Sequence, residues 1–322
     1  MLPIGYAAVF EFEMGRVPCA VKAQRIKLAL VDLDAETGTF GDADIAVLDL
    51  ERGLENADAE IGMVEQVWHK GHTFLSKELN SSGGVGLGGV GLVNVFEWRD
   101  TALYDSASVA DYFPLPGVGL LKKTDTSPFL FTKDYPTVPF EHAVETGENF
   151  VKIRTLPHLC CGVAMDMEKL YTLEGSTLHM DITVKNVGPR VIHATEFSHN
   201  FFNFDGGVIN SDYRLSFPYT IEPKLRRGEL IIERDAYRLG EFDGPTESSA
   251  FWIRGWEGLK SHWMKLENAA KGMSVLIEDG VPVCNFYSWN NFNAFCPEVF
   301  APIDLESGES VSYRRSYTFE VK

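Results

Sequence analysis

Alternation of apolar and polar residues along the second half of the chain constrains the fold most. Leu178, Met180, Ile182 and Val184 alternate with polar residues and precede a turn at residues 186–189. A period of two places the apolar side chains on one face of a half-buried antiparallel strand. From residue 151 onward most segments follow this pattern, with turn residues between them. The sequence therefore predicts an all-β fold, a large antiparallel β-sandwich or a barrel with few short helices.

The same pattern places the individual elements. We expect strands at residues 25–30, 92–98, 191–204, 229–232, 273–277 and 311–319, with residues 191–204 pairing with the strand at 178–185. On the last strand, one face should carry Val311, Tyr313, Arg315, Tyr317 and Phe319. Residues 50–68 have the best helical propensity and predict one short helix. No linker-like segment interrupts the chain, so we expect one domain over residues 1–322.

A glycine-rich segment, NSSGGVGLGGVG, occupies residues 80–91 and contains the pattern GxGxxG twice. A dinucleotide-binding fingerprint needs a buried strand before the glycines and a helix after them. The following residues, 92–98, alternate like a strand instead. This segment therefore predicts a loop, or a close approach of the backbone beside a ligand, rather than a nucleotide site.

Composition excludes several classes of partner. The 322 residues carry a formal net charge of -17, which disfavours nucleic acid and anionic membrane surfaces but not a neutral sugar. No window approaches the ~20 apolar residues of a membrane span, and the first residues lack a signal-peptide pattern. The five cysteines include no CxxC pair, so we expect reduced, buried thiols and a cytoplasmic protein. They are Cys19, Cys160, Cys161, Cys284 and Cys296.

The most informative segment for function is TEFSHNFFNFDG, residues 195–206. In an extended strand Phe197, His199 and Phe201 share one face, while Glu196 and Asn200 share the other. Neither face is purely apolar or purely polar, as expected for a strand that crosses the floor of a polar cleft. The alternative is a core histidine that makes a single hydrogen bond.

His199 and Glu298 are the candidate catalytic residues. Glu298 lies among apolar and aromatic residues in the segment FCPEVF, where burial would raise its pKa above the usual ~4.3 and make it a better base. A histidine beside a carboxylate can hold a proton near neutral pH. One group then donates a proton while the other accepts one. The alternative for Glu298 is a turn-forming or ion-paired carboxylate.

Three stretches resemble the aldose 1-epimerase, or galactose mutarotase-like, superfamily. The segment SHNFFN at residues 198–203 resembles its histidine-containing aromatic strand, and residues 295–300 resemble the late strand that carries its glutamate. Residues 303–308 resemble the turn that follows, and the Asn-Val-Gly turn at residues 186–188 also matches. The similarity covers about the last two thirds of the chain and indicates a divergent branch.

This resemblance implies a large antiparallel β-sandwich with a concave sugar-binding face. It also implies interconversion of the α and β anomers of an aldose without a metal or cofactor. His199 would then be the general acid that protonates the ring oxygen, and Glu298 the base that accepts the proton of the anomeric hydroxyl. The Asn-Arg-Ile segment and the His-Gly-Gly context of the best-known mutarotases do not occur, and His72 is the candidate to replace their second histidine.

Further residues could contact a sugar. Asn200 belongs to the motif strand, and Arg99, Asp105 and Trp289 could hydrogen-bond to a sugar or stack on it; surface ion pairs and a core aromatic are the alternatives. Glu65, His69 and His72 offer metal ligands, but their spacing fits no common zinc signature, so we expect no metal site.

We therefore expect an isomerase of the aldose 1-epimerase type that acts on a small-molecule sugar. Two alternatives on the same fold are a non-catalytic carbohydrate-binding protein and a lyase or hydrolase of a larger saccharide.

Overall fold

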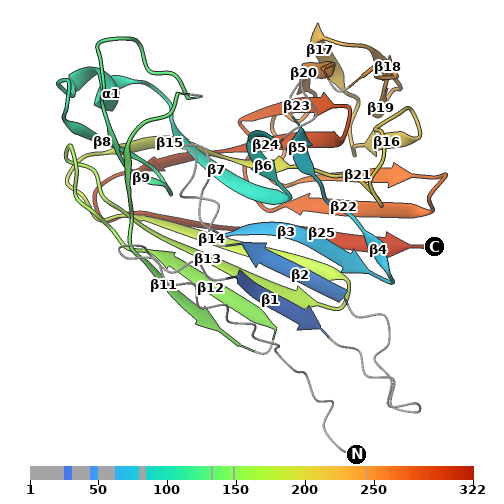
Figure 1. Cartoon of the computed structure of the whole chain (residues 1–322), viewed down its shortest axis with the longest axis horizontal. Coiled ribbons are helices and arrows are strands. Elements are labelled where there is room, and N and C mark those ends of the chain that lie inside the picture. The colour runs from blue at the N-terminus through green and yellow to red at the C-terminus, as the bar shows by residue number, and fades with distance from the viewer. Residues whose placement is uncertain are drawn as a thin grey trace, which may run out of the picture.

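A computed structural model describes residues 25–30, 44–49, 62–79, 85–131, 133–147, 149–244 and 246–322 (Figure 1). Their regular secondary structure is almost entirely β-strand, and all of their strand pairs are antiparallel. Within this part of the chain the only helix is α1, Ala102–Ser106. The expected all-β antiparallel architecture is thus confirmed.

The first sheet has ten strands and contains both motif strands. Its order is β1-β2-β3-β7-β15-β24-β23-β20-β17, with β4 paired to β3. The bounds are β1 Arg25–Leu30, β2 Asp44–Asp49, β3 Met63–His69, β4 His72–Thr73, β7 Leu92–Trp98, β15 Ile192–Asn200, β24 Ala294–Leu305, β23 Asn285–Asn291, β20 Ser248–Arg254 and β17 Glu222–Arg227.

The second sheet also has ten strands, in the order β11-β12-β13-β14-β25-β22-β21-β16-β19-β18. The bounds are β11 His142–Thr146, β12 Phe150–Thr155, β13 Met165–Glu174, β14 Thr177–Asn186, β25 Ser310–Val321, β22 Met273–Asp279, β21 His262–Asn268, β16 Tyr213–Ser216, β19 Ala236–Leu239 and β18 Leu230–Ile232.

Two smaller sheets lie beside these. A three-stranded sheet contains β8 Tyr112–Leu115, β9 Gly119–Lys122 and β10 Thr137–Pro139, and a pair contains β5 Lys77–Leu79 and β6 Val85–Val90. Figure 1 shows β8 and β9 next to α1, and Tyr104 of α1 packs edge-on against Phe113 of β8. This unit thus has its own small aromatic cluster.

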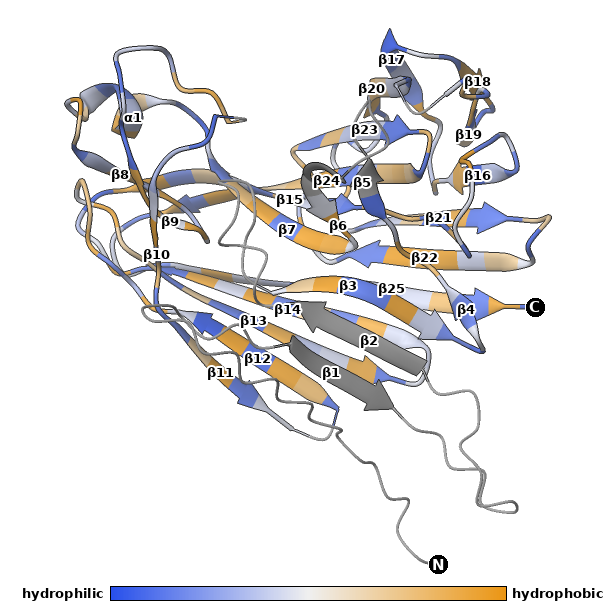
Figure 2. Cartoon of the chain, in the orientation of Figure 1, coloured by the Kyte–Doolittle hydropathy of each residue, from blue (hydrophilic) through white to orange (hydrophobic). Residues whose placement is uncertain are grey.

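The main core lies between the two large sheets. Ile192 and Val299 of the first sheet are fully buried in one cluster with Val184 and Ile277 of the second. Figure 2 shows hydrophobic and hydrophilic residues alternating along strands such as β12, as a strand with one buried face requires. Burial of this alternating apolar face holds the two sheets together as a sandwich.

Strand positions agree well with the sequence, but three local expectations do not. Residues 191–204 were expected to pair with β14, whereas β14 pairs with β13 and β25, and β15 pairs with β7 and β24 in the other sheet. The turn between β14 and β15 is therefore a crossover between layers. Residues 63–68 of the expected helix form strand β3, because β2 and β7 offer backbone partners; residues 50–61 lie outside the described residues.

The glycine-rich segment is also more regular than expected, since its residues 85–90 form β6 and pair with β5. Residues 80–84 lie outside the described part. At Gly89 the backbone closely approaches a side chain of the protein rather than a ligand, since an added Cβ would lie 2.2 Å from the ring of Phe201. A glycine is needed there because any side chain would overlap that ring.

Cysteine burial was only partly foreseen. Cys296 is buried, but Cys161 and Cys284 are exposed and Cys160 is half-buried. All four are free thiols, and Cys19 lies outside the described residues. The expectation that all of the cysteines are buried was therefore wrong. No helix in the described segments is long and apolar enough to cross a membrane.

Buried charges cross the core between the sheets. Arg315 of β25 has no exposed side-chain surface, and it donates to Glu196 of β15 at 2.5 Å and to Asp279 of β22. Asn94 donates to the other oxygen of Glu196 at 3.0 Å, and His262 lies 3.2 Å from Asp279. Burial opposes ionisation of Asp279, yet Arg315 and His262 together keep its pKa below the usual value. This network ties the strand that carries His199 to the opposite sheet.

Candidate active site

The site forms where strands β15 and β24 stop pairing through their backbones. The ladder between them runs as far as Phe197 opposite Phe300, and backbone hydrogen bonds resume between Phe202 and Phe295. The offset is the same on both sides of the gap, so no residue is inserted. Continuing this register places His199 opposite Glu298.

Side chains bridge the strands where the backbone does not. Pro297 has no N–H group to donate, and the Nδ2 atom of Asn200 donates to its carbonyl at 3.1 Å. The N–H of Val299 donates to Oγ of Ser198 at 3.3 Å, and Arg315 donates to the carbonyl of Val299 at 3.0 Å. The two peptide groups that flank Glu298 are thereby held from the core side.

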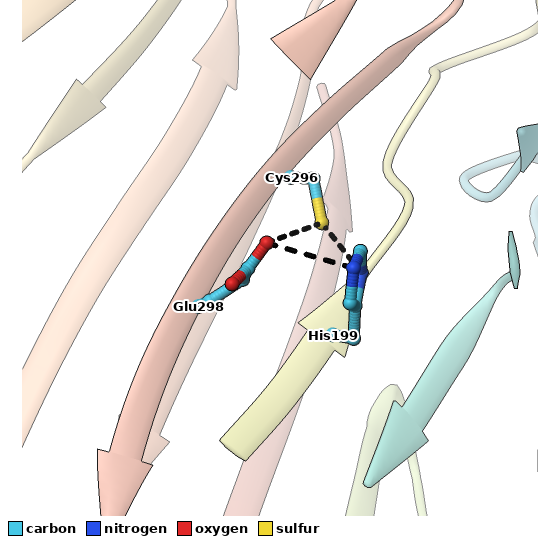
Figure 3. Close-up of side chains that lie close together, drawn as sticks. All are labelled: His199, Cys296 and Glu298. Atoms are coloured by element: carbon cyan, nitrogen blue, oxygen red, sulfur yellow. Dashed lines mark hydrogen bonds and ion pairs between the residues drawn. The ribbon is translucent and has the colours of Figure 1, made fainter. Parts of the chain in front are cut away.

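His199, Cys296 and Glu298 converge on the outer face of the first sheet (Figure 3). The Nε2 atom of His199 lies 3.6 Å from Oε1 of Glu298, and its Nδ1 atom lies 3.0 Å from Sγ of Cys296. The Cys296 sulfur is 3.9 Å from the same Glu298 oxygen. The predicted pair is therefore in proximity, joined by a thiol that the sequence did not bring forward.

Aromatic rings surround the histidine. The ring of Phe201 stacks on His199 with centroids 4.5 Å apart and planes 9° apart, and Trp289 approaches His199 edge-on at 6.4 Å. The His199 side chain is 25% exposed, whereas that of Glu298 is only 6% exposed. The imidazole is therefore the more accessible member of the pair.

Burial sets the protonation of the pair. It lowers the pKa of the His199 imidazole to about 4, so the ring is neutral at neutral pH. Burial also raises the pKa of the Glu298 carboxyl well above its usual value, and the negative charge of Glu97 raises it further. Desolvation therefore favours the neutral form of both groups, with the proton on Glu298 rather than on His199.

A second carboxyl group, that of Glu97, belongs to the same face. Glu97 lies on β7 opposite Thr195, two positions from Val95, whose side chain packs in the apolar cluster on this face with Phe197. Burial raises the pKa of Glu97 as well. The surroundings of Glu298 are therefore both apolar and already negative, which is unfavourable for a further negative charge.

The other predicted binding residues have different partners. His72 pairs with Asp205 at 2.7 Å, and Arg99 forms a two-pronged ion pair with Asp304. Asp105 accepts a hydrogen bond from Thr101 at 2.7 Å, within the turn that begins α1. For Arg99 this is the surface ion pair that the alternative interpretation expected, whereas Asp105 makes a hydrogen bond to Thr101 rather than an ion pair.

Asn200 and Trp289 both lie next to His199 and Glu298, but their side chains are on opposite faces of the sheet. Asn200 points into the core, where it accepts a hydrogen bond from Tyr317 at 3.1 Å and donates to Pro297. Its role is to position the strand rather than to contact a sugar. Trp289 shares the outer face with His199 and is the predicted binding residue best placed to contact a ligand.

The metal ligands considered from the sequence do not form a site. Glu65 pairs with Lys77 at 2.8 Å, and His72 with Asp205. Among the described residues, the only group of three potential metal ligands is His199, Cys296 and Glu298, whose ligand atoms all lie within 4.8 Å of one another.

Cys296 and Glu97 are the two residues that sequence reasoning missed. Cys296 lies two positions before Glu298, so in a strand both must point to the same face. Glu97 shares a face with Val93 and Val95, but its proximity to Glu298 depends on the pairing of β7, β15 and β24. Cys296 could therefore have been found from the period-two pattern of the strand, whereas Glu97 could be found only once the order of strands in the sheet was known.

No protein-family model matches this sequence, and no curated protein matches it. Solved structures with a similar fold include a candidate aldose 1-epimerase from Escherichia coli K12 with a TM-score of 0.59 and 14% identity. That match covers 92% of this chain and 100% of the other. A galactose mutarotase-like protein from Clostridium acetobutylicum aligns with a TM-score of 0.53 and 15% identity, over 94% and 96% of the two chains.

A candidate aldose 1-epimerase from Klebsiella pneumoniae gives a TM-score of 0.51 at 12% identity and covers 94% of this chain and 85% of the other. At these identities the likeness is one of fold. The chain has the galactose mutarotase-like β-sandwich fold, which the sequence resemblance predicted.

Proposed function

We propose that the protein is an isomerase of the aldose 1-epimerase type, which interconverts the α and β anomers of an aldose by general acid–base catalysis. The observation that carries this proposal is the proximity of His199 and Glu298, 3.6 Å apart on the outer face of a sandwich with the fold of such proteins. A neutral imidazole and a carboxylic acid form a complete donor–acceptor pair.

The chemistry needs one proton to leave and one to arrive. Ring opening requires a proton on the ring oxygen and removal of the proton from the anomeric hydroxyl; the bond between C1 and the ring oxygen then breaks, and C1 becomes a carbonyl. Rotation about the C1–C2 bond and reversal of both transfers closes the ring as the other anomer. The pair ends each cycle with the proton number it began with, so no cofactor is consumed.

Family resemblance assigns the acid to His199 and the base to Glu298. Burial favours the opposite resting state, with the proton on Glu298. The assigned roles therefore require the proton to shift from Glu298 to His199 when the hydroxyl groups of a sugar replace the apolar surroundings of the pair. A polar ligand stabilises the charged imidazolium and carboxylate forms, so sugar binding itself would drive this shift.

A sugar would approach the pair from the side of His199, because that ring is the more exposed member. Trp289 offers an aromatic face or edge beside it. Aromatic rings recognise the apolar C–H surface of a sugar, while the pair recognises its polar atoms at C1. We therefore propose Trp289 as a sugar-binding residue.

Polarimetry over a panel of neutral and phosphorylated aldoses tests the proposal. Wild-type protein should accelerate equilibration of at least one sugar, and His199→Asn or Glu298→Gln should each lower that rate roughly 10²–10⁴-fold. His193→Asn is the matched control, because His193 lies on the same strand with its side chain 60% exposed, paired with Asp304. This control should retain the wild-type rate.

If wild type, both variants and buffer alone equilibrate the anomers of every sugar in the panel at the same rate, the proposal that the protein is an isomerase is refuted. Saturable binding of a sugar without any acceleration would identify a carbohydrate-binding protein instead. Release of shorter saccharides from an oligosaccharide would identify a lyase or hydrolase.

A further inference from the structure

The acid–base pair does not account for Cys296. Its thiol lies in the same cluster, 3.0 Å from Nδ1 of His199 and 3.9 Å from Oε1 of Glu298, and the residue is fully buried. We propose that His199, Cys296 and Glu298 together bind a thiophilic divalent cation, for which Zn²⁺ is the best fit.

The separations agree with a metal-binding triangle. Zinc is held at about 2.0–2.3 Å by nitrogen, oxygen and sulfur, so neighbouring ligand atoms of a tetrahedral site lie roughly 3.3–3.8 Å apart. The imidazole offers one nitrogen to a metal: Nδ1 lies 3.0 Å from the Cys296 sulfur, and Nε2 lies 3.6 Å from Oε1 of Glu298. The sulfur lies 3.9 Å from that same oxygen. With one ligand atom taken from each residue, all three lie within 4.8 Å of one another, so side-chain rotation is needed to bring the longest edge into the range of a zinc site.

The donor set selects among metals. Imidazole, thiolate and carboxylate are the three common protein ligands of zinc, and three of them leave a fourth position for water or another ligand. A thiolate disfavours Mg²⁺ and Ca²⁺, which prefer oxygen ligands. The open position would face the side on which His199 is exposed.

Charge supports the same conclusion. A thiolate and a carboxylate neutralise one divalent cation, and a neutral complex suits surroundings made of apolar residues such as Phe201 and Ala294. Glu97 adds a negative group that is close enough to raise the pKa of Glu298. The surroundings that oppose an isolated carboxylate at Glu298 therefore favour a cation beside it.

The ligands are held in place before any metal arrives. Asn200 and Ser198 hold the peptides on either side of Glu298, and Phe201 stacks on the His199 ring. Cys296 itself has its backbone N–H bonded to Asn290 at 3.0 Å. Little ordering would accompany binding, which preserves affinity.

Binding of zinc would also block proton transfer, a consequence that depends on the proposed function. The metal would occupy the lone pair of His199 and the carboxylate of Glu298, so neither group could exchange a proton with a sugar. Zinc would act as an inhibitor that EDTA reverses.

Titration of chelator-treated protein with Co²⁺ tests the site without any sugar. Wild type should bind one equivalent per chain and show a thiolate-to-cobalt charge-transfer band together with the visible bands of tetrahedral cobalt. Cys296→Ser should lose the charge-transfer band. For Zn²⁺, measured by competition with a chromophoric chelator, Cys296→Ser and Glu298→Gln should each weaken binding more than the roughly 10–100-fold that losing an outer partner costs.

The control is the double variant Cys160→Ser/Cys161→Ser, which removes the adjacent free thiols whose sulfurs lie 3.7 Å apart. It should bind Co²⁺ as wild type does. Absence of a thiolate band in wild type, or its loss in this double variant rather than in Cys296→Ser, would overturn the metal site. Metal binding without sugar isomerisation would support the metal site and refute the proposed function. Sugar isomerisation without metal binding would support the proposed function and refute the metal site.

Discussion

At the residue scale, the chemistry of this protein depends on placing two titratable groups where water is scarce. His199 and Glu298 lie opposite one another between strands, and burial moves their pKa values in opposite directions toward neutrality of both. The aromatic context of FCPEVF predicted that Glu298 is buried, and the resemblance to mutarotase-like proteins implied that it shares a site with His199. The protonation states of His199 and Glu298 could not be predicted. They depend on how far each side chain is buried and on the charge of Glu97, which lies on a strand far away in the sequence.

The pH dependence of the reaction follows from these directions. In metal-free protein, the rate should fall on the acid side as His199 gains a proton near its lowered pKa of about 4. It should fall on the alkaline side as Glu298 ionises, at a pH above the usual carboxyl range. The measurement is kcat/KM against pH, corrected for buffer catalysis, with circular dichroism to confirm folding at each pH.

His199→Asn should flatten the acid limb of that profile. An acid limb centred near the ordinary histidine value of ~6.5 would show that the ring is not desolvated in the working enzyme. That result would contradict the geometry of the pair.

At the element scale, the gap between β15 and β24 creates the site. The strands keep their register, but in place of backbone ladder bonds Asn200 donates to the carbonyl of Pro297 and Ser198 accepts from the N–H of Val299. Period-two patterns predicted both strands, since Phe197, His199 and Phe201 had to share a face. The sequence did not predict the partner of β15, because the short turn at residues 187–191 suits a hairpin as well as a crossover between sheets.

Asn200→Ala tests the importance of these bridges. The change would leave the carbonyl of Pro297 and the hydroxyl of Tyr317 without their buried partner, and such a loss costs about 1–3 kcal/mol of unfolding free energy. Urea denaturation measures the effect. Asn210→Ala is the comparison, because the Asn210 side chain bonds only to Asp212 in its own turn, and it should change stability by less than about 0.5 kcal/mol. Equal effects of the two changes would argue against a bridging role.

At the scale of the whole molecule, a buried network joins the two sheets beneath the site. Arg315 reaches Glu196 in one sheet and Asp279 in the other, and also the carbonyl of Val299 beside Glu298. An arginine on the apolar face of the final strand was visible in the sequence. Its partners were not, because three strands far apart in the chain supply them.

Arg315→Met should therefore destabilise the protein strongly. It would leave two buried carboxylates without their cation, and breaking such a pair typically costs 3–5 kcal/mol. Its neighbour Arg314 is the matched control, since its side chain is 52% exposed and pairs with Asp181 on the surface. Arg314→Met should cost no more than about 1 kcal/mol. Guanidinium denaturation of both variants makes the comparison, and similar losses would show that Arg315 is not the link between the sheets.

Exchange between anomers followed by NMR tests the central claim most directly, in wild type, His199→Asn, Glu298→Gln and the double variant without metal. If the two groups act as one donor–acceptor pair, each single change should remove nearly all of the acceleration, and the double variant should lose little more than either alone. Independent losses that multiply in the double variant, or retained exchange in either single variant, would contradict a shared proton between His199 and Glu298.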